Sequence, residues 1–137
     1  MRTLHTAYRV TRLDVSLAFY TGLGYQVVGV VRFDHDGSLT MLKFPEEPVV
    51  TLELVYRPAD GKVDIGSGFS HLVINVDDLS ATLNSLRAAG LAPERAERPG
   101  GRNGPRTSWL TDPDGYRIEL VEWPPGHPPG LCATDFL

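Results

Sequence analysis

Residues 118–121 read Ile118-Glu119-Leu120-Val121, and residues 52–55, which lie 66 positions earlier, read Leu52-Glu53-Leu54-Val55. The same offset aligns five further pairs, namely His5 with His71, Val10 with Val76, Leu13 with Leu79, Leu17 with Leu83 and Gly24 with Gly90. Self-similarity at a constant spacing indicates a repeated structural unit. We therefore expect a single domain over residues 1–137, built from modules at about 1–66 and 67–123 and followed by a Pro-rich tail over 124–137.

Each module has the pattern of one helix and four strands, in the order βαβββ. Alternating apolar residues predict a first strand over 4–10 and 69–76, and apolar side chains at helical spacing predict helices that begin at Asp14 and Asp78. The remaining strands are expected over 25–33, 39–44 and 49–57 in the first module and over 92–97, 106–110 and 116–123 in the second. The fold class is therefore α+β, with a helix against one face of each sheet and the other face free.

The composition is that of an ordinary globular domain, with 42% hydrophobic and 22% charged residues. The 13 basic and 17 acidic residues give a net charge of −4, and Lys and Arg are nowhere concentrated, so we expect no nucleic-acid partner. No stretch reads as a membrane span, and the lone Cys132 cannot form an internal disulfide. These features predict a cytoplasmic protein.

Four side chains at matched positions of the two modules are candidate metal ligands: His5, Glu53, His71 and Glu119. Strand alternation places them opposite the apolar side chains expected to face the helices, such as Leu4, Tyr8 and Val10. Each glutamate interrupts an otherwise apolar strand, where an unpaired charge is costly. Two imidazoles and two carboxylates suit Ni²⁺, Co²⁺ or Mn²⁺ with positions left for a substrate, and Zn²⁺ is also possible. The alternative is that the histidines are structural and the glutamates pair with Arg9, Arg57 or Arg117.

The motifs Leu4-His5-Thr6, Leu52-Glu53-Leu54, Gly68-Phe69-Ser70-His71 and Asp112-Pro113-Asp114-Gly115-Tyr116-Arg117-Ile118-Glu119-Leu120 together resemble the glyoxalase I family of the vicinal oxygen chelate superfamily. The resemblance runs from residue 4 to about 123 and includes all four metal positions of the family. It implies a lyase that converts the hemithioacetal of methylglyoxal and a thiol to the S-lactoyl thioester through an enediolate. The short chain is more similar to the nickel or cobalt branch than to the zinc branch. The resemblance makes Glu119 the catalytic base and Glu53 its counterpart across the substrate.

The resemblance also implies residues that bind the thiol. Arg9 matches a position at which the family grips a glutathione carboxylate, and Arg102 lies where the family carries a basic residue over the tripeptide. Arg57 departs from the family's usual asparagine, and a fixed cation binds differently from a neutral amide. Glutathione or another low-molecular-weight thiol, such as mycothiol, is therefore expected as the cosubstrate.

Short members of the family pair one module with the other module of a partner chain, which implies a homodimer with its metal sites at the interface. Two other functions stay open. Methylmalonyl-CoA epimerase shares the fold and the metal, although this chain lacks a basic cluster suited to a CoA phosphate. A non-catalytic protein that sequesters antibiotics such as bleomycin shares the cavity, but such proteins generally lack the metal set.

Overall fold

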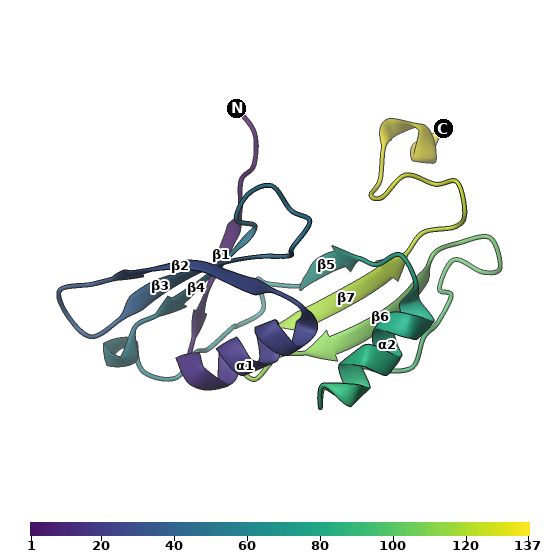
Figure 1. Cartoon of the computed structure of the whole chain (residues 1–137). Helices are drawn as coiled ribbons and strands as arrows, with labels where there is room; N and C mark the ends of the chain where they lie inside the picture. The colour runs from purple at the N-terminus through teal and green to yellow at the C-terminus, as the bar shows by residue number, and fades with distance from the viewer. The chain divides into compact units, whose positions relative to one another are not determined.

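The computed structural model describes residues 1–137, which divide into two compact units, Met1–Gly66 and Ser67–Leu137. Each unit carries one α-helix and a mixed β-sheet, so the expected α+β class with two βαβββ-like modules is confirmed (Figure 1). Neither helix has the length and apolar character needed to traverse a bilayer.

The first unit consists of β1 (Thr6–Val10), α1 (Leu13–Leu23), β2 (Gln26–Arg32), β3 (Ser38–Lys43) and β4 (Leu52–Tyr56), followed by a 3₁₀ turn over Pro58–Asp60. Its sheet has the order β1-β4-β3-β2. The first strand, β1, runs parallel to the last strand, β4, and the other neighbours are antiparallel. The parallel pair therefore brings residues from the two ends of the module side by side.

The second unit consists of β5 (His71–Asn75), α2 (Leu79–Ala88), β6 (Arg106–Thr111) and β7 (Arg117–Glu122), followed by a tail with a 3₁₀ turn over Ala133–Phe136. Its sheet has the order β5-β7-β6, with β5 parallel to β7 and β6 antiparallel to β7. The first strand of this unit is again parallel to its last strand, so both units place matched residues of the repeat on adjacent strands.

One face of each sheet is buried in the core of its own unit. In the first unit Leu52 and Leu54 are at most 1% exposed, and Tyr20 of α1 lies with its ring centroid 6.4 Å from that of Tyr8. The core of the second unit is formed by Ile118 and Leu120 of β7, Leu110 of β6, and Leu79, Leu83 and Leu86 of α2. Because side chains alternate along a strand, the residues between these buried positions lie on the opposite face of each sheet.

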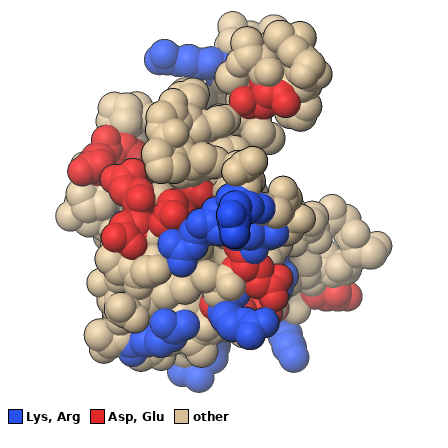
Figure 2. Space-filling model, turned by 90° about the vertical axis from the view of Figure 1, so that its right-hand side faces the viewer, with Lys and Arg blue, Asp and Glu red and all other residues tan.

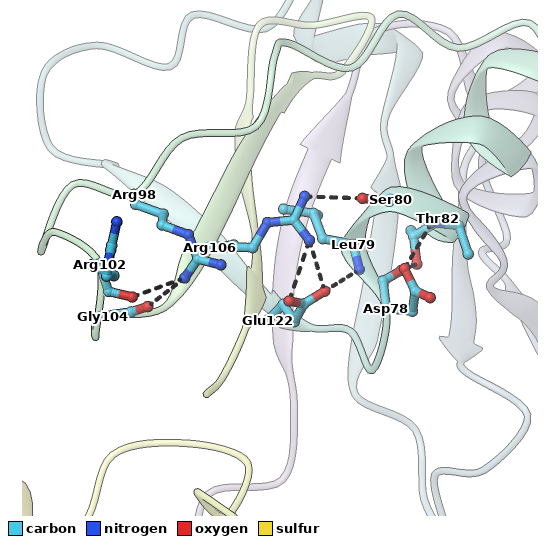
Figure 3. Close-up of polar contacts among 10 residues, drawn as sticks. Asp78, Leu79, Ser80, Thr82, Arg98, Arg102, Gly104, Arg106 and Glu122 are labelled. Carbon is cyan, nitrogen blue, oxygen red and sulfur yellow. Dashed lines mark hydrogen bonds and ion pairs between the residues drawn. The ribbon is translucent and has the colours of Figure 1, made fainter. Parts of the chain in front are cut away.

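Charged groups hold the start of α2 against the sheet of the second unit (Figure 3). The Glu122 carboxylate, at the end of β7, accepts a hydrogen bond from the Leu79 N–H at 2.6 Å. Arg106 of β6 donates to both Glu122 oxygens at 3.4 Å and to the Ser80 hydroxyl at 2.9 Å. The side chain of Asp78 caps the helix by accepting from the Ala81 N–H at 2.9 Å, as its position in the sequence predicts.

Two local expectations are wrong. Residues 92–97 form no strand: one isolated bridge joins Glu97 to Thr107. Pro93 in this segment has no N–H to contribute to a ladder of hydrogen bonds. Leu4, which alternation places toward the helix, is 59% exposed because β1 begins only at Thr6.

Candidate metal centre

The first His–Glu pair, His5 and Glu53, lies on the parallel strands of the first unit. Glu53 is the second residue of β4, opposite Ala7 of β1, and His5 directly precedes β1. Leu52 and Leu54 on either side of Glu53 point into the core, which leaves the carboxylate on the other face of the sheet. The Nε2 atom of His5 lies 3.1 Å from Oε2 of Glu53, and the two side chains are 33% and 14% exposed.

The second His–Glu pair, His71 and Glu119, occupies the matched positions of the second unit. His71 is the first residue of β5, and Glu119 lies in β7 opposite Val73. The distance from Nε2 of His71 to Oε2 of Glu119 is 3.4 Å, and the side chains are 32% and 20% exposed. The Ser70 hydroxyl lies 2.7 Å from Nδ1 of His71. When Nδ1–H donates to this hydroxyl, the Nε2 lone pair points toward the carboxylate side and is available to a ligand.

The donor atoms and their spacing fit a divalent cation. Two ligands held about 2.1 Å from an ion are about 3.0 Å apart at a right angle and about 3.4 Å apart at a tetrahedral angle. The measured separations of 3.1 Å and 3.4 Å fall in this range. No group of three or more His, Cys, Asp or Glu side chains is placed to hold an ion. Each unit therefore offers two of the ligands that such an ion needs.

Two of the arginines considered as alternative partners of the glutamates have other contacts. Arg117 forms an ion pair with Glu94 at 2.7 Å, and Arg57 lies over the Phe33 ring with its guanidinium carbon 5.9 Å from the centroid. Each of the two glutamates instead has a histidine nitrogen close to its carboxylate, at 3.1 Å in the first unit and 3.4 Å in the second. This arrangement weakens the interpretation in which Arg57 or Arg117 neutralises them.

The arginines expected to bind the thiol lie in both units. Arg9 is in β1, two residues after Ala7, and donates to the Gly61 carbonyl at 3.3 Å, whereas Arg57 directly follows β4. Arg102 is exposed in the loop before β6 of the second unit. Arg98 donates to the Arg102 and Gly104 carbonyls at 3.5 and 3.2 Å and so closes that loop (Figure 3). Acidic and basic side chains occur together on the face drawn in Figure 2.

Sequence reasoning missed two neighbours of the second His–Glu pair. The Trp109 ring of β6 meets the His71 ring edge-on, with centroids 5.0 Å apart, and Ser70 contacts the other ring nitrogen. Trp109 is also directly opposite Glu119 in the β6–β7 ladder. The pairing register of β6 with β7 would have predicted that Trp109 lies near the second His–Glu pair. The position of Ser70 next to His71 in the sequence could have predicted the contact of its hydroxyl with the imidazole.

Comparison with known proteins agrees with the fold. The family model described as Glyoxalase/Bleomycin resistance protein/Dioxygenase superfamily matches residues 2–120. A probable lactoylglutathione lyase of Vibrio parahaemolyticus is 34% identical over 124 residues, which cover 88% of this chain and 90% of that protein. A glyoxalase I variant from Zea mays superposes with a TM-score of 0.78 at 28% identity, and the match covers 88% of this chain but only 45% of the plant chain. The trypanothione-dependent glyoxalase I of Leishmania major superposes with a TM-score of 0.72 at 30% identity, covering 89% of this chain and 86% of that one. The chain therefore belongs to the Glyoxalase/Bleomycin resistance protein/Dioxygenase superfamily.

Proposed function

We propose that this chain is a metal-dependent lyase of the glyoxalase I type, which converts the hemithioacetal of methylglyoxal and a low-molecular-weight thiol to the S-lactoyl thioester. The observation that carries the proposal is the presence of equivalent His–Glu pairs, with separations of 3.1 and 3.4 Å, at matched positions of the two units. Relatives at about a third identity that are named lactoylglutathione lyase support the same reaction class.

His5, Glu53, His71 and Glu119 would hold the ion, with Ni²⁺ or Co²⁺ favoured and Zn²⁺ possible. When bound, the ion supplies Lewis-acid stabilisation of the negative charge that develops on the substrate oxygens. The histidines contribute neutral donors and the glutamates contribute two negative charges, so the four side chains together neutralise a divalent cation. Ser70 would keep the His71 ring in the tautomer that leaves Nε2 free.

The proposed chemistry moves one proton between adjacent carbons. The carboxylate of Glu119 removes the proton from the carbon that carries the sulfur and returns it to the neighbouring carbon, while the hydroxyl proton passes to the former carbonyl oxygen. The reaction is therefore an isomerisation that needs no oxidant or reductant. Glu53 is the counterpart on the other side of the substrate. Both carboxylates lie on strands whose alternate residues are buried, so the backbone that carries them is held by its core packing.

Because each unit offers two ligands, we further propose a homodimer in which the first His–Glu pair of one copy meets the second pair of its partner. A two-fold axis would generate two equivalent sites. Arg9, Arg57 and Arg102 are proposed to bind the thiol part of the substrate, with Arg57 setting which thiol is accepted. We place the enzyme in the cytoplasm, where the exposed thiol of Cys132 stays reduced.

Substitution of Glu119 tests the proposal most directly. Glu119→Gln keeps the shape of the side chain but removes the base, and we expect turnover to fall by at least about a hundredfold, the lower range for a general base. Metal affinity should fall less than in His71→Ala, because the amide oxygen still coordinates. Thioester formation measures turnover and equilibrium dialysis measures bound metal, with the exposed Glu46→Gln as the control.

Three results would contradict this assignment. Near-normal turnover of Glu119→Gln together with inactive Glu53→Gln would reverse the roles of the two carboxylates. A wild-type protein that binds no divalent ion and gains no activity from Ni²⁺, Co²⁺ or Zn²⁺ would favour an antibiotic-binding protein. Metal-dependent epimerisation of methylmalonyl-CoA without hemithioacetal turnover would favour the epimerase.

A further inference from the structure

Three side chains of the second unit form a connected set beside the second His–Glu pair: Glu94 in the segment before β6, Trp109 of β6 and Arg117 of β7. We propose that this set, the Trp109 support, is a positioning unit that orients the His71 imidazole for metal binding. The inference rests on the proposed function and assigns it residues that lie outside the proposed ligand set.

The Trp109 support forms a series of contacts that begins at Glu94 and ends at His71. Glu94 pairs with Arg117 at 2.7 Å, and Arg117 also donates to the Thr111 hydroxyl at 2.8 Å. The guanidinium carbon of Arg117 lies 5.0 Å from the centroid of the Trp109 ring, within the range of a cation–π contact. The Trp109 ring meets the His71 ring at 74° with a centroid distance of 5.0 Å. Arg117 is thus held at two polar contacts while its guanidinium covers the ring that meets the imidazole.

The backbone fixes the same residues. Glu94 N–H donates to the Trp109 carbonyl at 2.8 Å, so the residue that holds Arg117 is itself tied to Trp109. Arg117 is directly opposite both His71 on β5 and Thr111 on β6. Backbone pairing therefore keeps all three residues of the Trp109 support next to one another.

The two histidines differ in how they are held within their units. His71 is contacted by Ser70 at Nδ1, by Glu119 near Nε2 and by Trp109 at its ring. His5 lies before β1 and has Glu53 as its polar partner. A ligand whose ring is already oriented loses less conformational freedom on binding, so the second pair is expected to dominate the metal affinity of the protein.

The charges of the Trp109 support explain why Glu94 belongs to it. Arg117 is two residues from Glu119 on the same face of β7, where an unbalanced cation would oppose a divalent ion. The carboxylate of Glu94 balances that charge at 2.7 Å. Glu94→Gln should therefore weaken metal binding more at low salt than at high salt, because mobile ions screen the uncovered charge.

Tryptophan fluorescence tests the positioning role without measuring activity. The chain has two tryptophans, so Trp123→Phe leaves Trp109 as the only source of tryptophan emission. An open-shell ion such as Co²⁺ or Ni²⁺ bound at His71 should quench that emission. In this background, Arg117→Met is compared with Arg95→Met, which removes the same charge from an exposed position of the same unit.

In metal-free protein, Arg117→Met should lower the emission anisotropy of Trp109 and raise its quenching by acrylamide. When Glu94→Gln is also present, so that no unpaired carboxylate is left to attract the ion, the metal affinity of Arg117→Met should fall about threefold to tenfold, the range expected when a cation–π contact is lost. Arg117→Lys should recover part of both losses.

The outcomes separate this inference from the proposed function. If Arg117→Met matches Arg95→Met in both anisotropy and metal affinity, the positioning role is wrong while the metal site stands. A loss of anisotropy with unchanged metal affinity would also overturn it, because Trp109 would then move without consequence for His71. If the full-length wild-type protein binds no Co²⁺ or Ni²⁺ by dialysis, the proposed function fails and this inference fails with it.

Discussion

Glu122→Ala should be among the most destabilising single changes at a charged residue of the second unit. The carboxylate accepts a hydrogen bond from the Leu79 N–H at 2.6 Å and pairs with Arg106 at 3.4 Å (Figure 3). Its side chain is 21% exposed and that of Arg106 is 25% exposed, so water replaces these contacts poorly. The substitution removes the group that ties the start of α2 to the end of β7.

The magnitude follows from the two contacts. A hydrogen bond to a charged group contributes about 1.5–3 kcal/mol, and a partly exposed ion pair contributes less than about 1 kcal/mol. We expect a loss of about 2–3 kcal/mol in the free energy of unfolding, because the two contacts share one carboxylate and do not add fully. At about 4 °C per kcal/mol for a chain of this size, the melting temperature should fall by about 8–12 °C.

Urea unfolding followed by tryptophan emission measures this loss. Both tryptophans, Trp109 and Trp123, lie in the second unit, so their emission reports on the unit that contains Glu122. The protein should be metal-free and at one concentration, because metal binding and association both raise apparent stability. Glu97→Ala, at an exposed position of the second unit, is the matched control and should change stability by less than about 0.5 kcal/mol.

Two results would refute the reasoning. A loss in Glu122→Ala no larger than that in Glu97→Ala would show that the contacts to α2 and Arg106 contribute nothing net. Glu122→Gln should lose less than Glu122→Ala, because its amide oxygen still accepts from the Leu79 N–H. Equal losses in the two variants would mean that the hydrogen bond at 2.6 Å is not the stabilising contact.

Three further predictions concern the site and the tail. Mixing a variant that lacks both proposed ligands of the first unit with one that lacks both ligands of the second should restore about a quarter of wild-type turnover, since half the dimers then hold one intact site; sites formed within one chain would show no recovery. Arg57→Asn should shift the kcat/KM preference toward the hemithioacetal of glutathione, measured against hemithioacetals of other thiols, and an unchanged preference would remove Arg57 from thiol recognition. In the tail, hydrogen bonds to the Pro128 carbonyl and then to Asp135 raise the pKa of His127. Because the pKa is raised, the stability that protonated His127 gives to the tail is complete below the ordinary pKa of histidine. This stability is lost as the pH rises through the raised pKa. Proteolysis of the tail should accelerate over that interval, and Asp135→Asn should move the acceleration to lower pH.

Patterns along the sequence predicted the architecture well where they reflect local geometry. The alternation around Glu53 and Glu119 identified the buried neighbours Leu52, Leu54, Ile118 and Leu120, all of which are at most 1% exposed. The α+β class and the repeat of the βαβββ-like unit followed from the same periodicity. These predictions succeed because side-chain alternation and helical spacing depend on the backbone of a few adjacent residues.

Expectations that depend on non-local hydrogen bonding failed or could not be formed. The segment 92–97 forms one isolated bridge with β6, between Glu97 and Thr107, and a further hydrogen bond from the Glu94 N–H to the Trp109 carbonyl. It forms no ladder, because a ladder needs an uninterrupted series of donors on both strands and Pro93 has no N–H. Glu122 contacts Leu79, 43 positions away, and Arg106, 16 positions away, and no local pattern in the sequence predicts these contacts.

The sequence by itself determined that His5, Glu53, His71 and Glu119 occupy matched positions of a repeat and that each glutamate lies on the face of its strand opposite the buried residues. Only the tertiary structure decided that each histidine stands within 3.1 or 3.4 Å of its glutamate, and that Trp109 and Ser70 contact one histidine. The physical reason is the parallel pairing of β1 with β4 and of β5 with β7. The paired strands are far apart in the sequence, because a helix and at least one other strand lie between them. Alternation states which way a side chain points, whereas the register between distant strands sets what it meets.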